Sequence, residues 1–172
     1  MSDKLKPAAP ETAAAESALA VLDALPAHVA VLDRRGRIVS VNHAWRAFAD
    51  ANTLRLTDHG VGSSYLAACE GLEEPDSDLA HAAAAGIRAV LAGAVPSYSM
   101  EYPCHSPAQQ RWFQLTATPL KDGGHGMAVV MHLNITEQRL AKDRLHESDR
   151  RLRSLLDNMD LIAVMLDREA RI

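Results

Sequence analysis

The sequence predicts an α+β fold, in which helices cover one face of a five-stranded antiparallel sheet. The first observation is a pair of apolar runs, 28–33 and 37–42, separated by a three-residue turn. The second is a stretch of short helical patterns over 43–92, and the third is a set of further apolar runs at 95–102, 111–118 and 127–133. Strands and helices that are segregated along the chain are typical of antiparallel sheets, because parallel strands need a long crossover between them.

The composition is that of a folded domain with a core of its own. Hydrophobic residues make up 48% of the 172 positions, charged residues make up 23%, and the net charge is −4, so a nucleic-acid partner is not expected. No apolar run is long enough to cross a membrane, and Cys69 and Cys104 form no CxxC pair. We therefore expect a cytoplasmic protein with reduced thiols and no membrane association within this chain.

Two segments precede the predicted sheet, and they differ in character. Residues 1–11 contain two prolines and no apolar cluster, so we expect a disordered tail. Residues 12–25 are rich in alanine and carry leucines three positions apart, which predicts a flanking helix that Pro26 ends. The domain itself is expected to span residues 26–135.

Glycine and polar residues predict where the elements within this domain turn and end. Gly36 suits the left-handed position of the turn between the first two strands. A helix is expected over 79–92, with Ser77 or Asp78 as its N-cap and Gly93 at its C-terminal end.

A long linker helix is predicted directly after the last strand. Residues 136–158 contain neither Gly nor Pro, and at 1.5 Å per residue the helix would be roughly 35 Å long. Its start carries a capping-box pattern, in which an asparagine accepts from the first free amides and a glutamate reaches back. We expect a movement of the last strand to pass into this helix through a relay of four residues: Asn134, Ile135, Thr136 and Glu137.

The same helix carries heptad-spaced positions that favour a parallel homodimer. One series consists of Leu145, Leu152 and Met159, and its partner series consists of Ala141, Ser148 and Leu155. The alternative is a helix that lies on its own domain.

A short internal repeat links the two ends of the chain. Residues 22–38 align without gaps on residues 156–172, and the paired positions are 134 apart. Seven of the 17 pairs are identical: Leu22/Leu156, Asp23/Asp157, Leu32/Leu166, Asp33/Asp167, Arg34/Arg168, Arg37/Arg171 and Ile38/Ile172. A repeat of this length predicts a tandem domain, so residues 159–172 are expected to begin a second copy. The alternative is two hairpins that are similar by accident.

Several short motifs accompany the predicted elements in a fixed order. They are Asn42-x-Ala44 after the second strand, Val61-Gly62 followed by Tyr65-Leu66, Arg111-Trp112-Phe113, Pro119, and Asn134-Ile135-Thr136 before the long helix. Over about residues 26–137 this ordered set resembles a PAS sensor domain. The resemblance implies a sheet whose helices enclose a ligand pocket, dimerisation through flanking helices, and a place ahead of a histidine kinase or diguanylate cyclase in a bacterial signalling protein.

Side-chain alternation along 111–118 places Phe113, Leu115 and Ala117 on one face of the strand, and the resemblance implies that this face looks inward. We expect a pocket between the sheet and the helices to be lined by eight residues: Phe48, Tyr65, Ile87, Val90, Leu91, Met100, Phe113 and Leu115. The alternative is a filled core without a ligand.

The sequence identifies no cofactor, and we expect none. Haem and flavin remain open alternatives. Some oxygen-sensing PAS domains bind haem through a histidine on the helix before the third strand, where this chain has His81. Neither Cys69 nor Cys104 lies in the Asn-Cys-Arg-Phe context of the photoactive flavin class, which leaves non-covalent flavin. No zinc-type spacing is present, so no metal is expected.

We therefore expect a sensory module that binds a small ligand or partner. Its state would be relayed through a dimeric linker helix to a downstream PAS domain and to a kinase or cyclase. The alternatives are a passive dimerisation or spacer module with a filled core, and a haem- or flavin-binding redox or gas sensor. No paired carboxylates, nucleophile–base pair or phosphate-binding loop stands out, so no enzyme activity is expected in this chain.

Overall fold

The computed structural model describes residues 20–52, 57–72, 77–106, 109–120 and 126–157. The chain divides after Ile135 into two units. The expected tail at 1–11, most of the expected flanking helix at 12–25 and the expected second domain at 159–172 concern residues outside this described part.

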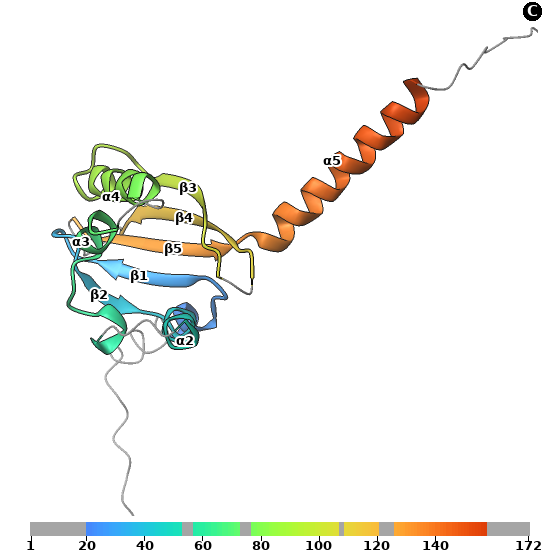
Figure 1. Ribbon diagram of the computed structural model, residues 1–172. Coiled ribbons are helices and arrows are strands. Elements are labelled where there is room, and N and C mark those ends of the chain that lie inside the picture. Colours follow the sequence, from blue (N-terminus) through green and yellow to red (C-terminus); the bar gives the residue numbers. More distant parts are fainter. Residues whose placement is uncertain (1–19, 53–56, 73–76, 107–108, 121–125, 158–172) are drawn as a thin grey trace, which may run out of the picture. The chain divides into compact units, whose positions relative to one another are not determined.

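The sheet of the first unit has five antiparallel strands in the order β2-β1-β5-β4-β3 (Figure 1). The strands are β1 (His28–Leu32), β2 (Ile38–Val41), β3 (Tyr98–Pro103), β4 (Trp112–Pro119) and β5 (Ala128–Asn134). Although β5 is the last of the strands in the described residues, it is the central strand and pairs with both β1 and β4. The fold class predicted from the sequence is confirmed.

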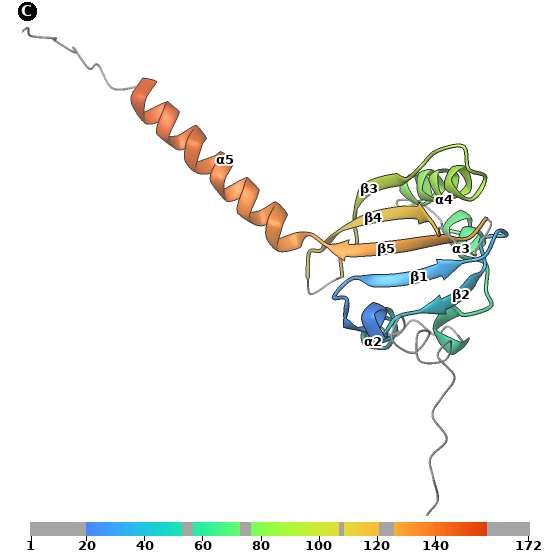
Figure 2. The same cartoon turned by 180° about the vertical axis from the view of Figure 1, so that it is seen from behind.

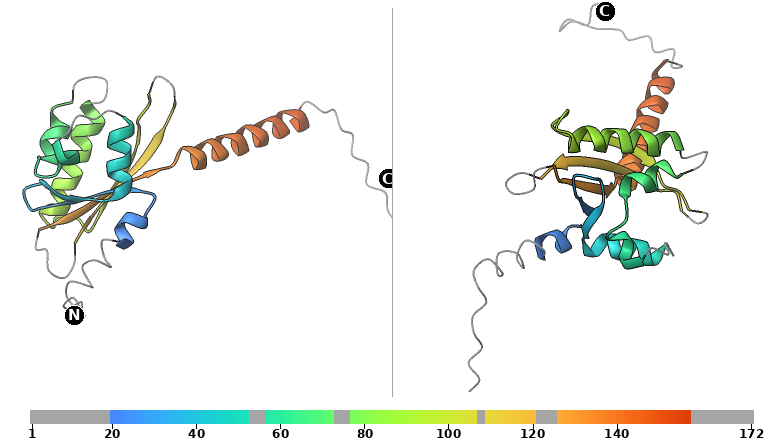
Figure 3. Two further views of the ribbon diagram at one scale, coloured as in Figure 1. Left: turned by 90° about the horizontal axis from the view of Figure 1, so that it is seen from below. Right: turned by 90° about the vertical axis from the view of Figure 1, so that its left-hand side faces the viewer.

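Three helices, α2 (His43–Ala51), α3 (Tyr65–Glu70) and α4 (Ser77–Leu91), lie on one face of the sheet (Figures 2 and 3). A 3-10 turn, η1 (Thr57–Gly60), lies between α2 and α3 in the sequence.

Two details of the predicted elements need correction. Helix α4 already includes Ser77 and Asp78 in its first turn, so the prediction that either residue is its N-cap is wrong. Sequence patterns do not fix a helix start to better than one or two residues. Strand β3 begins three residues later than expected, because the chain first turns out of α4 through Gly93, whose φ is +71°.

The turn between β1 and β2 follows the sequence prediction. Gly36 has φ +73°, a left-handed conformation that glycine adopts without strain. Asp33 supports the same turn, because its Oδ1 accepts hydrogen bonds from the backbone N–H groups of Arg35 and Arg37 at 2.8 and 2.9 Å.

The core lies between the sheet and helices α2–α4. Phe113, Leu115 and Ala117 of β4 are at most 2% exposed, so the inward direction of this face is confirmed. Gly86 allows α4 to approach β3 closely, because a Cβ atom at that position would lie 2.4 Å from the Tyr98 ring.

The described part of the flanking helix lies on the other face of the sheet. Residues 20–24 are helical and stop before Pro26, as the sequence predicts. Leu22 lines a small cavity together with Val29 and Val31, which alternate along β1 with inward-facing core residues. Figure 3 shows this helical turn and α2 on opposite sides of the sheet.

The second unit contains the predicted linker helix, α5 (Thr136–Asp157), which has 22 residues and no buried side chain. Its surface carries an ion pair at i,i+4 spacing, in which Arg151 Nε donates to Glu147 Oε1 at 2.8 Å. None of the helices in the described ranges has both the length and the apolarity that a membrane span requires.

Candidate ligand site

A cavity of about 130 Å³ lies between the sheet and helices α2 and α3. Side chains from four strands or strand ends and from both helices line it: His28, Trp45, Phe48, Ala49, Tyr65, Tyr102, Cys104, Phe113 and His132. An engineered cavity of about 150 Å³ in another protein binds benzene, so this space accommodates one small ring. The fused ring system of a haem or a flavin is much larger than the space that these side chains leave.

Aromatic rings form the walls of this cavity. Phe113 stacks on Tyr102 at a centroid distance of 5.9 Å and meets Phe48 edge to face at 5.8 Å. The ring of His28 lies 4.4 Å from that of Phe48, and the Arg111 guanidinium lies 5.3 Å from the same Phe48 ring. Such walls favour a planar apolar guest, because offset and edge-to-face ring contacts add to the burial of apolar surface.

Four polar side chains from three elements form one continuous series, which we call the His132 chain. His132 is on the inner face of β5, opposite His28 on β1. Its Nε2 lies 2.9 Å from the Tyr65 hydroxyl, and its Nδ1 lies 2.6 Å from the Tyr102 hydroxyl. Cys69 lies one turn further along α3, packs against the same core as Tyr65 and adds to the effect of burial in raising the pKa of the Tyr65 hydroxyl.

All four groups of the His132 chain are uncharged at neutral pH. Burial lowers the pKa of His132 to about 4, with a smaller contribution from His28. Burial raises the pKa of Cys69 to about 11, and it raises the pKa values of Tyr65 and Tyr102 further above their usual range. The pKa of His28 is also lowered, by burial and by the charge of Arg111. The cavity therefore presents neutral polar groups.

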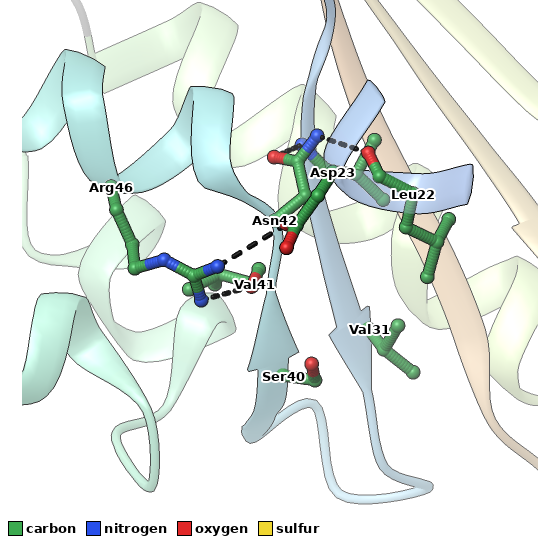
Figure 4. A pocket seen from close by; sticks show the side chains of 8 residues that line it. Leu22, Asp23, Val31, Ser40, Val41, Asn42 and Arg46 are labelled. Atoms are coloured by element: carbon green, nitrogen blue, oxygen red, sulfur yellow. Dashed lines mark hydrogen bonds and ion pairs between the residues drawn. The ribbon is translucent and has the colours of Figure 1, made fainter. Parts of the chain in front are cut away.

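A second buried polar cluster, which we call the Asn42 hub, lies beside a cavity of about 160 Å³ (Figure 4). Asn42 is 3% exposed. Its Oδ1 accepts from the backbone N–H groups of Val29 and Trp45 at 2.9 and 3.0 Å, and its Nδ2 donates to the carbonyls of Leu22 and Ala27, both at 2.9 Å. These four bonds use the whole capacity of an asparagine amide and join the flanking helix, β1 and α2.

Asp23 adds a second connection between the flanking helix and α2. Its Oδ1 accepts from the backbone N–H of His43, the first residue of α2, at 2.6 Å and lies 3.2 Å from Arg46 Nη2. Arg46 also donates to the Val41 carbonyl at 2.7 Å, and Figure 4 shows dashed lines from its guanidinium to both partners.

Comparison with known proteins identifies the family. A family model described as the PAS fold matches residues 22–140. The chain belongs to the PAS family. An uncharacterized 104.1 kDa protein encoded in the hypE 3′ region of Rhodobacter capsulatus is 49% identical to this chain over 119 residues, which are 68% of this chain and 12% of that protein.

Solved structures show the same fold at low sequence identity. The phage VqmA–DPO complex matches with a TM-score of 0.54 and 16% identity over 80% of this chain and 60% of that one. An RNA-binding light-oxygen-voltage receptor matches with a TM-score of 0.50 and 16% identity over 92% of this chain and 43% of that one.

Three of the eight residues expected to line the PAS pocket do line the cavity: Phe48, Tyr65 and Phe113. Ile87, Val90 and Leu115 are fully buried in the packed core, and Leu91 and Met100 pack against that core while partly buried.

The sequence interpretation missed the residues that give this PAS cavity its polarity. His28, Tyr102 and His132 line it, as does Trp45 of α2. A signal for His132 was present, because it is in phase with the inward-facing residues Ala128 and Val130 on the same strand.

His81, the haem ligand in the alternative left open by the sequence, does not line the cavity. His81 is exposed on α4, and its Nε2 lies 3.3 Å from the Glu70 carbonyl oxygen. Within the described ranges no group of three metal-ligating side chains occurs.

The relay residues lie at the junction of β5 and α5. Asn134 is the last residue of β5, and Thr136 and Glu137 begin α5. Ile135 lies between them, is 7% exposed and donates its N–H to the Trp112 carbonyl at 2.9 Å. The chain is therefore tightly held up to Ile135, and capping of α5 by Asn134 stays a prediction.

Proposed function

We propose that this PAS domain is a sensor that binds one small, uncharged molecule in the cavity around His132. The observation that carries the proposal is the position of His132, a buried neutral imidazole on the central strand, at the wall of a cavity the size of a small ring. A buried polar group beside an apolar cavity is the arrangement expected of a specific ligand site.

The strand that carries His132 supports a relay to α5. β5 is hydrogen-bonded on both sides, and a single residue, Ile135, separates its end from the start of α5. A ligand that favours one arrangement of β5 would bias the helix by its difference in affinity for the two arrangements. Asn134, Ile135, Thr136 and Glu137 are the residues proposed to carry that change.

The apolar positions of α5 support a homodimer. Leu145, Leu152 and Leu155 are each between 57% and 64% exposed, and they follow the two heptad series together with Ala141 and Ser148. A second copy of the helix would bury these leucines. Sedimentation of the protein beside a Leu145→Glu/Leu152→Glu variant tests this, and a monomeric parent protein would refute it.

The first copy of the repeat supports a downstream PAS domain. Six of its seven identical positions make defined contacts: Leu22 and Asp23 bind the start of α2, Leu32 and Ile38 are in the core, Asp33 supports a turn, and Arg37 Nη1 donates to the Gly62 carbonyl at 3.1 Å. The identical residues in 156–172 are therefore ones that a second copy of this fold would need.

A kinase or cyclase after that second PAS domain completes the proposed signalling chain. If the natural chain continues past residue 172, an asparagine is expected 134 positions after Asn42, where it would form a second hub. An unrelated residue at that position would argue against the tandem arrangement.

Filling the cavity tests the ligand-binding function. Ala49 lines the cavity from α2, whereas Ala47 is exposed on the same helix, so Ala49→Leu and Ala47→Leu form a matched pair. We expect benzene, followed by NMR titration, to bind the parent protein and Ala47→Leu saturably, and to lose that binding in Ala49→Leu. Absence of saturable binding in the folded parent protein would instead support a passive spacer with a filled core.

A further inference from the structure

We infer that the molecule recognised in this cavity is a hydrogen-bond donor: a neutral, planar, ring-sized compound whose N–H or O–H group bonds to the hydroxyl oxygen of Tyr102. This inference rests on the proposed ligand-binding function and specifies the chemistry of the ligand. It follows from the direction of the hydrogen bonds along the His132 chain, that is, from which group donates and which accepts at each contact.

The first step is the count of hydrogens on the His132 ring. A neutral imidazole has one N–H donor and one bare nitrogen, so one of its two tyrosine partners donates to the ring and the other accepts from it. The Tyr102 contact at Nδ1 is 2.6 Å and the Tyr65 contact at Nε2 is 2.9 Å. Hydrogen bonds from hydroxyl groups are shorter than those from N–H groups. Tyr102 is therefore the donor to Nδ1, and Nε2–H donates to Tyr65.

The second step concerns the other end of the His132 chain, at Tyr65 and Cys69. Tyr65 receives the hydrogen of His132, so its own hydroxyl hydrogen needs another acceptor. The thiol of Cys69 supplies one, because it lies four residues further along α3, on the same side of the helix as Tyr65. The order Tyr102→His132→Tyr65→Cys69 uses every hydroxyl and ring hydrogen. The reverse order would have to begin with the weak S–H donor of cysteine.

The third step concerns the hydrogen-bonding capacity that this order leaves unused at the cavity wall. Tyr102 lines the cavity, and its hydrogen is already used on His132. A hydroxyl oxygen has two lone pairs, so Tyr102 offers the guest an acceptor and no donor.

The charge of the guest follows from its surroundings. Burial of an unpaired charge among the aromatic walls is costly, and the Arg111 guanidinium beside Phe48 repels a cation. A carboxylate guest carries no hydrogen for Tyr102. A neutral ring with an N–H or O–H group satisfies each of these conditions, and a volume of about 130 Å³ limits it to a single ring.

Three ring-sized probes separate the possible hydrogen-bonding roles: pyrrole donates only, pyridine accepts only, and benzene does neither. The experiment measures their dissociation constants at pH 8 by NMR titration of the folded 172-residue protein and of Tyr102→Phe. Tyr98→Phe is the matched control, because the Tyr98 hydroxyl donates to Met100 Sδ on the same strand and Tyr98 does not line the cavity.

We expect Tyr102→Phe to weaken pyrrole binding roughly fivefold, the effect of about one hydrogen bond, and to leave pyridine and benzene unchanged. The inference is overturned if pyridine is the probe that weakens, or if the three probes respond equally. Failure of all three to bind the parent protein overturns the proposed ligand-binding function as well. If Tyr102→Phe does not fold, the parent protein decides, because pyrrole must then shift the His132 ring-nitrogen resonances more than pyridine does.

Discussion

Two buried polar clusters in this PAS domain differ in the kind of partner they use. The Asn42 hub bonds only to backbone groups, and its four bonds exhaust the amide. The His132 chain bonds only through side chains and reaches the wall of a cavity. The fold fixes the positions of backbone partners. Hydroxyl and imidazole hydrogens, in contrast, change their hydrogen-bond partners without a movement of the polypeptide backbone. This difference fits a stabilising role for the Asn42 hub and the proposed role of the His132 chain in ligand recognition.

The two clusters meet at β1. The Asn42 hub holds the N–H of Val29, and the adjacent residue His28 pairs with His132 across to β5. The Asn42 hub therefore fixes the position of β1, which is the strand that pairs with His132 on β5.

The largest expected effect is the loss of the Asn42 hub. Asn42→Ala removes four hydrogen bonds and leaves buried backbone groups without a partner, so we expect it to lower the free energy of unfolding by about 4 kcal/mol. Urea denaturation measures this. Asn52→Ala is the comparison, because Asn52 ends α2 as a half-buried cap whose Nδ2 donates to the Phe48 carbonyl and whose Oδ1 accepts from Arg111 Nη2 at 3.0 Å, and its loss should cost only about 2 kcal/mol. Equal costs would remove the distinction between the Asn42 hub and an ordinary cap.

The second-largest expected effect is the dependence of the free energy of unfolding on pH, which His132 causes. The unfolded chain binds a proton at this histidine below its ordinary pKa of 6.5, whereas the folded protein does so only near a pKa of about 4. Stability should therefore be insensitive to His132 above pH 6.5 and fall as the pH drops towards 4, by about 3 kcal/mol in total.

The comparison of His132→Gln with His28→Gln isolates that contribution. The pKa of His28 is also lowered, so both variants should flatten the profile of unfolding free energy between pH 6.5 and 4, and His132→Gln should flatten it more. A parent profile with the same slope as that of His132→Gln would contradict the assignment of a neutral, buried ring.

The smallest effect is expected at the end of the His132 chain. Cys69→Ala removes the acceptor for the Tyr65 hydroxyl, and because sulfur is a weak acceptor the cost should be no more than about 1 kcal/mol. Cys69→Ser restores an acceptor and should recover most of that loss in thermal denaturation. A serine variant less stable than the alanine variant would indicate that packing alone determines this position.

Sequence periodicity predicted the parts of this domain that depend on local pattern. The five strands, the left-handed Gly36 and the shared face of Phe113, Leu115 and Ala117 follow from residue spacing and turn chemistry, whereas the inward direction of that face came from the resemblance to PAS domains. The Asn42 hub was visible only as a family motif, because its partners Leu22 and Val29 lie far away in the sequence.

The cavity itself could not be predicted from sequence periodicity. Whether Phe48 and Ile87 line a space or fill it depends on how the helices pack on the sheet, which no single strand or helix pattern records. His132 follows the inward phase of β5, yet one histidine on an apolar strand is compatible with a satisfied core residue. Only the meeting of Tyr65, Tyr102 and His132 from three elements distinguishes the two.

The most direct test of the account is the protonation state of the His132 ring, measured by nitrogen-15 NMR of imidazole-labelled protein at pH 7. The account predicts a neutral ring with its hydrogen on Nε2 and a bare Nδ1 that accepts from Tyr102. A hydrogen on Nδ1, or a charged imidazolium at that pH, would contradict it.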